Sequence, residues 1–182
     1  MRKVITIILL SLLVIASVSA SAIHSLNFAY SVHEGSHIGI DYSGSSTSPV
    51  HVYGGIYGLF ALGNARPGVT AGIYLGPGFS IPLNENRSLL LQLAAAVDIP
   101  MCFYKSTIGT GIGVIADIGL KWRFSSGLLS DGIFLSAGVK GGYYFGYLNM
   151  DLSNIGDLDS IANEDKLMRY RITPYLGLGF AF

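Results

Sequence analysis

The sequence predicts an all-β fold, an antiparallel up-and-down transmembrane β-barrel, and three observations support this prediction. Charged residues make up only 12% of the 182-residue chain and hydrophobic residues 51%, whereas a soluble domain carries about 25% charged residues. Beyond residue 22, no apolar run approaches the roughly 20 residues of a membrane-spanning helix. Apolar and polar residues alternate instead along most of the chain, and only a closed barrel satisfies the backbone hydrogen bonds of strands in lipid.

Residues 1–22 are expected to be a cleavable signal peptide. Two basic residues follow Met1, an apolar stretch occupies residues 4–18, and small residues would allow cleavage after Ala20 or Ala22. This apolar stretch is short for a membrane span, although an uncleaved anchor helix is the alternative. Residues 23–182 are then expected to form a single barrel domain.

The first two strands are expected at residues 24–32 and 37–43, where apolar residues occupy every second position. A turn near residues 33–37 would separate them and bring the total to eight strands. Without that turn, residues 26–42 would form one long strand and the total would be seven. An even number is usual for bacterial barrels.

The turn segment contains a motif that suggests a different function. His33-Glu34-Gly35-Ser36-His37 matches H-E-x-x-H, which on a helix places two zinc-binding imidazoles and a general base on one face. Here the central glycine and serine and the alternation on both sides indicate strands and a polar loop. On one strand the two histidines would lie about 13 Å apart, too far for one zinc ion. A turn could bring them together, so a metal site stays open, and none is assigned.

Residues 51–61 leave the orientation of the third strand undecided. Both faces carry large apolar or aromatic side chains, with Tyr53, Tyr57 and Leu59 on one and Val52, Ile56 and Phe60 on the other.

The remaining strands alternate more regularly. They are expected at residues 69–81, 89–103, 112–124, 133–147 and 168–182. In the last segment every even position is apolar, whereas the odd positions carry arginine, threonine, tyrosine, glycine and alanine.

The composition of the second face decides which side points outward. A soluble lipocalin-like barrel would expose a face rich in lysine and glutamate, but here this face holds glycine, alanine, serine and a few charges of both signs, which suit a narrow interior. The apolar face is therefore expected to meet lipid. The charges expected inside are Asp98, Asp117, Lys121, Arg123, Lys140, Arg169 and Arg171. We expect them to form an ion-pair network that plugs the barrel, and an ion path or ligand site is the alternative.

Only one of the expected connections, near residues 151–165, is long. Those near residues 44–49, 84–88 and 125–131 are expected on the side of the chain termini, the periplasm. Those near residues 33–37, 63–67, 105–111 and 151–165 would face outward, and the last is acidic. Calcium binding there is conceivable, but the twelve-residue ligand pattern is missing and a solvated loop is the simpler interpretation.

The end of the chain resembles the C-terminal recognition signal of bacterial outer-membrane barrels. Tyr175, Gly177, Phe180 and Phe182 occupy its polar, glycine, apolar and terminal aromatic positions. By this resemblance the barrel-assembly machinery would read these residues, through the exposed edge of the strand. The mature chain as a whole resembles the small eight-stranded barrels of the OmpA and OmpX type. It is expected to depart from them in its three short outer loops and in having no peptidoglycan-binding domain after Phe182.

These observations together predict an integral outer-membrane protein with no catalytic role, which serves a structural or surface-interaction function. Lipid of the outer membrane is the expected partner. A formal net charge of zero argues against a nucleic-acid partner, and no cofactor is indicated. A narrow channel or hydrophobic-ligand conduit is the first alternative. The second is a lipid-acting enzyme, for which His33, Glu34, Ser36 and His37 form the only dense cluster of titratable and nucleophilic groups.

Overall fold

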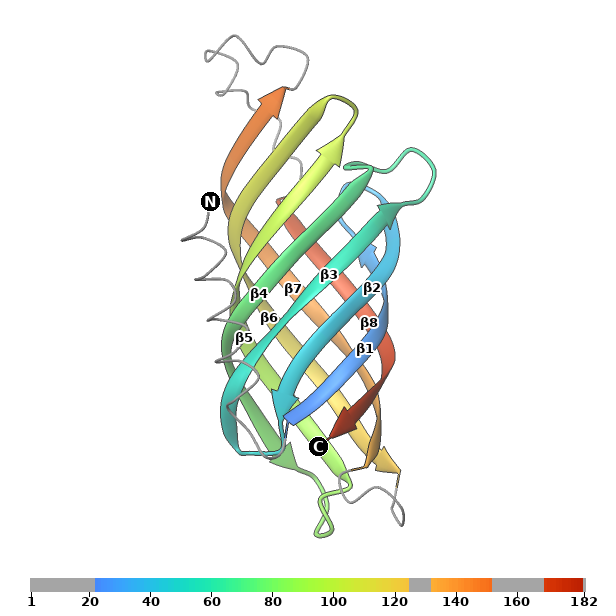
Figure 1. The fold of residues 1–182 in the computed structure, drawn as a ribbon, viewed down its shortest axis with the longest axis vertical. Helices are drawn as coiled ribbons and strands as arrows, with labels where there is room; N and C mark the ends of the chain where they lie inside the picture. Colours follow the sequence, from blue (N-terminus) through green and yellow to red (C-terminus); the bar gives the residue numbers. More distant parts are fainter. Residues whose placement is uncertain (1–21, 125–131, 152–168, 182) are drawn as a thin grey trace, which may run out of the picture.

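The computed structural model describes residues 22–124, 132–151 and 169–181, and in these ranges the chain forms a closed barrel of antiparallel strands joined in sequence order (Figure 1). The strands are β1 (Ala22–Val32), β2 (Ser36–Ser46), β3 (Val50–Ala61), β4 (Val69–Pro82), β5 (Leu89–Tyr104), β6 (Thr107–Phe124), β7 (Ile133–Asp151) and β8 (Tyr170–Ala181). The barrel closes where β1 pairs with β8. The predicted signal peptide lies outside the described residues, except for Ala22, which begins β1.

The turn between β1 and β2 decides the strand number in favour of eight. Ser31 pairs with His37 and Val32 with Ser36, so the chain reverses within residues 33–35. Glu34 and Gly35 reverse it with positive φ angles of 41° and 123°. A side chain at Gly35 would collide with Ala65, because the β3–β4 connection lies directly against this turn.

Apart from β3, whose orientation the sequence left open, the strands point their apolar face outward, as predicted. In β8, Ile172, Leu176 and Leu178 are more than half exposed, whereas Arg171, Thr173 and Tyr175 are buried. In the part of the chain that the structure describes, no helix is long and apolar enough to cross a membrane.

The orientation of β3, which the sequence left open, follows from its pairing with β4. Tyr57 and Tyr53 are buried and Ile56 is 57% exposed, so the tyrosine face points inward. Tyr57 lies opposite Gly72, and a Cβ atom at Gly72 would overlap the Tyr57 ring. Glycines that face the lumen therefore leave the space in which the tyrosine rings lie.

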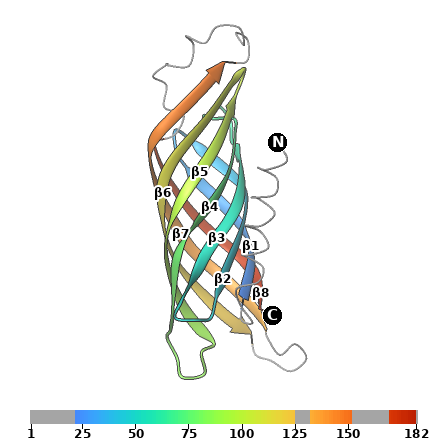
Figure 2. The same cartoon turned by 60° about the vertical axis from the view of Figure 1, so that its left-hand side comes forward.

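The strands differ in length, so the two sides of the barrel differ in height. β1 and β2 have 11 residues each, whereas β5, β6 and β7 have 16, 18 and 19. The last pair between β7 and β8 is Tyr143 with Tyr170, and beyond it the only pairing of β7 among the described residues is with β6. Figures 1 and 2 show β5, β6 and β7 rising above the other strands at the upper end.

Candidate functional site: the barrel interior and its two ends

An ion pair that crosses the lumen lies at the centre of the interior. Lys140 Nζ of β7 lies 2.5 Å from Asp41 Oδ1 of β2, and both side chains are almost fully buried. Lys140 also donates to the hydroxyl of Tyr74 on β4 (2.7 Å), which in turn donates to Asp41 Oδ1 (3.1 Å). Three strands from different sides of the barrel therefore meet in one closed set of hydrogen bonds.

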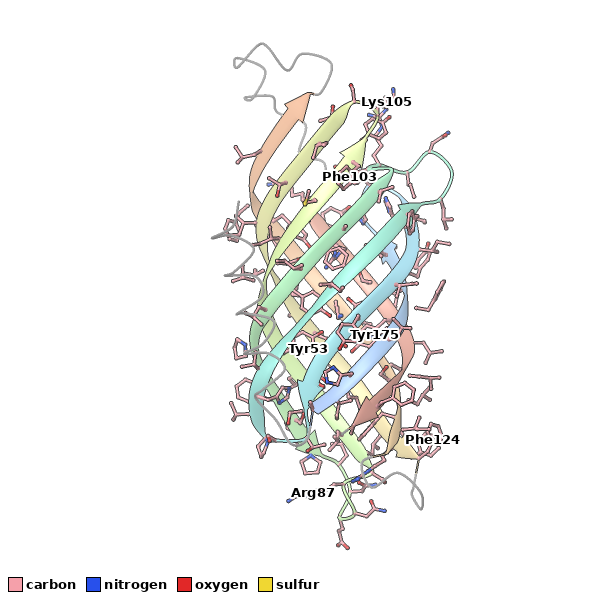
Figure 3. All side chains as sticks on the ribbon, viewed as in Figure 1. Tyr53, Arg87, Phe103, Lys105, Phe124 and Tyr175 are labelled. Carbon is pink, nitrogen blue, oxygen red and sulfur yellow. The ribbon has the colours of Figure 1, made fainter. Side chains whose placement is uncertain are left out.

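A second set of hydrogen bonds is centred on Asp117. Its carboxylate accepts from Tyr53 (2.5 Å) and from Tyr175 (2.9 Å), and these two rings lie within the barrel in Figure 3. The Lys140 ammonium lies over both rings, at 5.8 Å from the Tyr53 centroid and 5.1 Å from that of Tyr175. Toward the lower end, Lys121 donates to Ser45.

A third set lies between the centre and the upper end. Arg171 Nη2 of β8 donates to Asp98 Oδ2 of β5 at 3.1 Å, and both side chains are buried. The same carboxylate accepts from Tyr144 (2.5 Å) and Tyr57 (3.2 Å). The Arg171 guanidinium lies 3.9 Å from the centroid of the Tyr57 ring. A buried arginine held by a carboxylate and an aromatic face has little freedom to move out of the lumen.

The charges buried in the described interior balance. Those that the sequence assigned and the structure buries are Asp98, Asp117, Lys121, Lys140 and Arg171. Asp41 completes the set and was not predicted, although its position between the outward residues Ile40 and Tyr42 could have identified it. Three carboxylates thus lie with three cations, so the interior attracts neither anions nor cations through an excess of charge.

Two of the predicted interior charges lie at an end of the lumen or beyond it. Arg169 is exposed because β8 begins only at Tyr170, and residue 169 lies beyond the last β7–β8 pair. Arg123 is half-buried at the lower end of β6, where its guanidinium lies 5.8 Å from the Phe134 ring. The alternation of residues predicts on which face of the strand each of these arginines lies. It does not predict how far along the strand the lumen extends.

The upper end of the lumen is covered by the β1–β2 turn and the connection between β3 and β4. Arg66 N donates to Glu34 O (3.2 Å) and Leu62 N to Ser36 O (2.8 Å). Underneath, the rings of His33 and His37 stack with centroids 3.8 Å apart and planes 13° apart. The turn has therefore brought the two histidines together, as the sequence allowed.

The stacked histidines do not form the zinc site that H-E-x-x-H describes. Stacked imidazoles direct their lone pairs in parallel and not toward one point, and His37 Nε2 already donates to Pro67 O at 2.8 Å. Glu34 is exposed, whereas both histidine rings are buried. Among the residues that the structure describes, no group of three or more His, Cys, Asp or Glu could hold a metal ion.

The buried His33 makes the stability of this end sensitive to acid. Burial, followed by the nearby His37 ring and Arg171 guanidinium, lowers the pKa of His33 from 6.5 to about 3. Between these two pH values the unfolded chain binds a proton at residue 33 that the folded chain does not. Acidification therefore favours the unfolded state.

We expect the free energy of unfolding to fall below pH 6.5 with a contribution from His33 of up to about 1.4 kcal/mol per pH unit. His33→Gln should lack this contribution, because glutamine does not titrate. Urea denaturation in detergent at pH values from 4 to 8 measures the difference between the two curves. If the two proteins lost stability in parallel over this range, His33 would not be the titrating group.

The lower end is closed by apolar side chains. Ile23, Leu90 and Phe134, from β1, β5 and β7, pack together inside the barrel, and Ala181 of β8 packs against them. Ile23 and Phe134 have no exposed surface, and Leu90 is 2% exposed. The lumen is thus occupied from a polar upper end through a charged centre to an apolar lower end.

The residues of the predicted assembly signal take different positions. Tyr175 is buried and bonded to Asp117, Gly177 is half-buried opposite Asn27, and Phe180 is 47% exposed on the outer face. Phe182 lies outside the described residues. The role of these residues in assembly stays a prediction.

The outer surface is apolar around the whole barrel. We call this surface the apolar belt; it includes Leu26, Ile40, Ile56, Ile73, Val97, Ile118, Val139 and Leu176, each at least 46% exposed. Aromatic side chains lie near both ends, among them Trp122 and Phe124, whose ring centroids are 4.9 Å apart. Phe103 and Phe124 mark the upper and lower ends in Figure 3. Charged side chains lie inside this barrel and apolar side chains outside. This distribution is the reverse of that in a water-soluble barrel and suits a lipid bilayer.

No protein-family model and no curated protein matches this sequence. Among solved structures, the crystal structure of Neisserial surface protein A (NspA) matches with a TM-score of 0.58 and 10% identity, over 88% of this chain and 96% of that chain. The chain has the fold of the small outer-membrane β-barrels. The N-terminal β-barrel domain of Pseudomonas aeruginosa OprF matches with a TM-score of 0.47 and 14% identity, over 89% of this chain and 98% of that chain. A major outer membrane protein from Thermus thermophilus matches with a TM-score of 0.47 and 12% identity, over 88% of this chain and 99% of that chain.

The shared fold and the apolar belt lead to the same conclusion. In an outer-membrane β-barrel the outward face of the strands contacts hydrocarbon and the inward face is polar, which is the distribution described above. The protein is therefore an outer-membrane β-barrel whose strands cross the lipid bilayer. Its lower end carries the short β2–β3 and β4–β5 connections together with the ends of β1 and β8 that pair with each other.

Proposed function

We propose that this outer-membrane barrel is a non-catalytic, non-conducting protein with a structural or surface-interaction role. The observation that carries the proposal is the Lys140–Asp41–Tyr74 set, in which side chains from β7, β2 and β4 meet across the middle of the lumen. A barrel of eight strands has an interior just wide enough for side chains to fill. The hydrogen bonds to Asp117 and to Asp98 fill further parts of the lumen.

The orientation proposed for the protein follows the usual arrangement of bacterial barrels. The lower end, with its short turns, would face the periplasm, and the upper end would face the outside. The outer contacts of the cell would then be made by the β1–β2 turn, the β3–β4 and β5–β6 connections, and the tall β5–β7 side.

Planar-bilayer recording tests the proposal. We expect the wild-type protein to give no steady conductance steps, because the ion pairs and the apolar cluster at Ile23, Leu90 and Phe134 block the path. A porin recorded in the same bilayers shows that the recording detects an open lumen. Steady ion-conducting steps from the wild-type protein would instead support the narrow channel.

The other two functions receive less support from the interior. A conduit for hydrophobic ligands needs a continuous apolar path, but charged groups occupy the centre of the lumen. A lipid-acting enzyme would need His33 and His37 to reach substrate, and both are fully buried beneath the β3–β4 connection. Lipid turnover that is lost in both His33→Ala and His37→Ala, with folding intact, would favour the enzyme.

A further inference from the structure

The apolar belt has a hollow near the lower end of the barrel. A cavity of about 400 Å³ opens on the outer face of β5, β6 and β7, lined by Asn84, Leu89, Leu120, Trp122, Leu135 and Ala137. Five of these residues lie on the outward face of their strands, and Asn84 belongs to the β4–β5 connection. We call this feature the outer groove.

The pairing of the strands explains why the surface is hollow at this place. Ala137 lies between Leu120 on β6 and Leu176 on β8, so a short side chain interrupts a row of long ones. Next to it, Trp122 pairs with Leu135 and with Leu89. The Phe124 ring packs against the Trp122 indole on its other side. The large side chains around Ala137 therefore form the walls of the groove, with Trp122 held in place by Phe124, and Ala137 forms its floor.

The occupant that fits the outer groove is an acyl chain. The groove is continuous with the apolar belt, which meets hydrocarbon if the protein spans the membrane as described. Dispersion contacts with an acyl chain are lost wherever a gap remains, so a groove of fixed shape favours a chain that fills it. Its polar groups lie toward the lower end, where a lipid headgroup would be.

Two side chains at that end can donate hydrogen bonds to a lipid headgroup. The indole of Trp122 has one N–H donor, and such amphipathic rings are enriched where lipid meets water. Asn84 is exposed, and its amide has two N–H donors, one of which bonds Ser88 Oγ at 2.7 Å. The ester and phosphate oxygens of a phospholipid are acceptors that match these donors.

We propose that the outer groove binds one phospholipid of the leaflet at the lower end, with an acyl chain over Ala137 and the headgroup beside Trp122 and Asn84. The proposal rests on the proposed membrane orientation, in which this leaflet is the periplasmic one. The bound lipid stays with the barrel longer than the lipids that surround the rest of the apolar belt.

The position of the only tryptophan in the chain makes this site directly measurable. Trp122 is that residue, so bromine atoms on an acyl chain in the groove would quench all of the tryptophan fluorescence. The folded protein in detergent micelles is titrated with a phosphatidylcholine that carries a dibrominated acyl chain. We expect saturable quenching at about one lipid per barrel. Native mass spectrometry of the same samples should retain one phospholipid.

Two Ala→Leu variants distinguish binding in the outer groove from binding elsewhere on the apolar belt. Ala137→Leu fills the floor of the groove. It should raise the lipid concentration that gives half-maximal quenching at least tenfold and remove the retained lipid. Ala71→Leu makes the same change on the outer face of β4, away from the groove, and should titrate like the wild-type protein. Quenching that rises without saturation, or equal titration of the two variants, would overturn the proposal. Protein dimers that disappear in Ala137→Leu would also overturn it, in favour of a second copy as the occupant.

A separate measurement shows whether the apolar belt lies in lipid at all. If Trp122 in phospholipid vesicles emitted at the wavelength of indole in water and were quenched by iodide, the apolar belt would not lie in lipid. If instead Trp122 lay in lipid but showed no saturable site, only the bound phospholipid would be wrong.

Discussion

Ile118→Arg is expected to lower the free energy of unfolding by about 2 to 4 kcal/mol, because it places a guanidinium on the lipid face near the middle of the bilayer. Ile118 is 60% exposed and follows Asp117, whose carboxylate lies in the hydrogen-bonded interior. Its side chain therefore points to hydrocarbon at mid-height. Denaturant unfolding in phospholipid vesicles, followed through Trp122 fluorescence, measures the change.

Leu83→Arg is the matched control for this substitution. Leu83 is 49% exposed and lies just after β4, at the lower end of the barrel. Because the cost of an arginine falls to about 0–1 kcal/mol near the membrane surface, Leu83→Arg should change stability little. Equal losses from the two variants would mean that Ile118 does not face hydrocarbon, and the arrangement of the faces would have to be reversed.

Lys140→Met is expected to destabilise the barrel by about 3 to 5 kcal/mol. Removing one partner of a buried ion pair leaves the other charge without compensation, and here the Asp41 carboxylate would remain. The effect extends further, because the Lys140 ammonium also lies over the Tyr175 ring, whose hydroxyl donates to Asp117. Denaturant unfolding in detergent micelles measures the loss.

A double-mutant cycle distinguishes the lost ion pair from lost packing. Asp41→Leu alone should be destabilising for the same reason, since it leaves the Lys140 ammonium unpaired. The double variant Asp41→Leu and Lys140→Met contains neither charge and should be less destabilised than the sum of the two single changes. If Asp41→Leu does not fold, Asp41→Asn replaces it in the cycle. Strictly additive losses would mean that the pair contributes nothing beyond its separate side chains.

The sequence predicted which face of most strands points to lipid, because the same physical requirement applies at every second residue. Lipid requires an apolar side chain, and the lumen requires a small or hydrogen-bonded one, so β8 could be oriented from its sequence alone. In β3 this contrast is missing, since Tyr53 and Tyr57 are as bulky as the outward Val52 and Ile56. Only the pairing of Tyr57 with Gly72 on the next strand shows which face fits the lumen.

The pairing of charges within the lumen could not be predicted. Asp98 and Arg171 come from strands β5 and β8, and Asp41 and Lys140 from β2 and β7, so their meeting depends on the tilt and register of the closed barrel. The ends of the strands depend on the same geometry, which is why Arg169 shares the parity of Arg171 but lies outside. The stacking of His33 on His37 needed the tight turn, which the sequence offered only as one of two possibilities.

The unequal height of the barrel wall affects how the protein sits in a bilayer of uniform thickness. Beyond Tyr143, β7 continues for roughly 25 Å along the strand, and Phe145 and Leu148 on this extension are 63% and 62% exposed. β1 and β2, with 11 residues each, are just long enough to cross hydrocarbon. Covering the apolar surface on both sides therefore requires the barrel axis to lean, or the membrane to thicken locally beside β7.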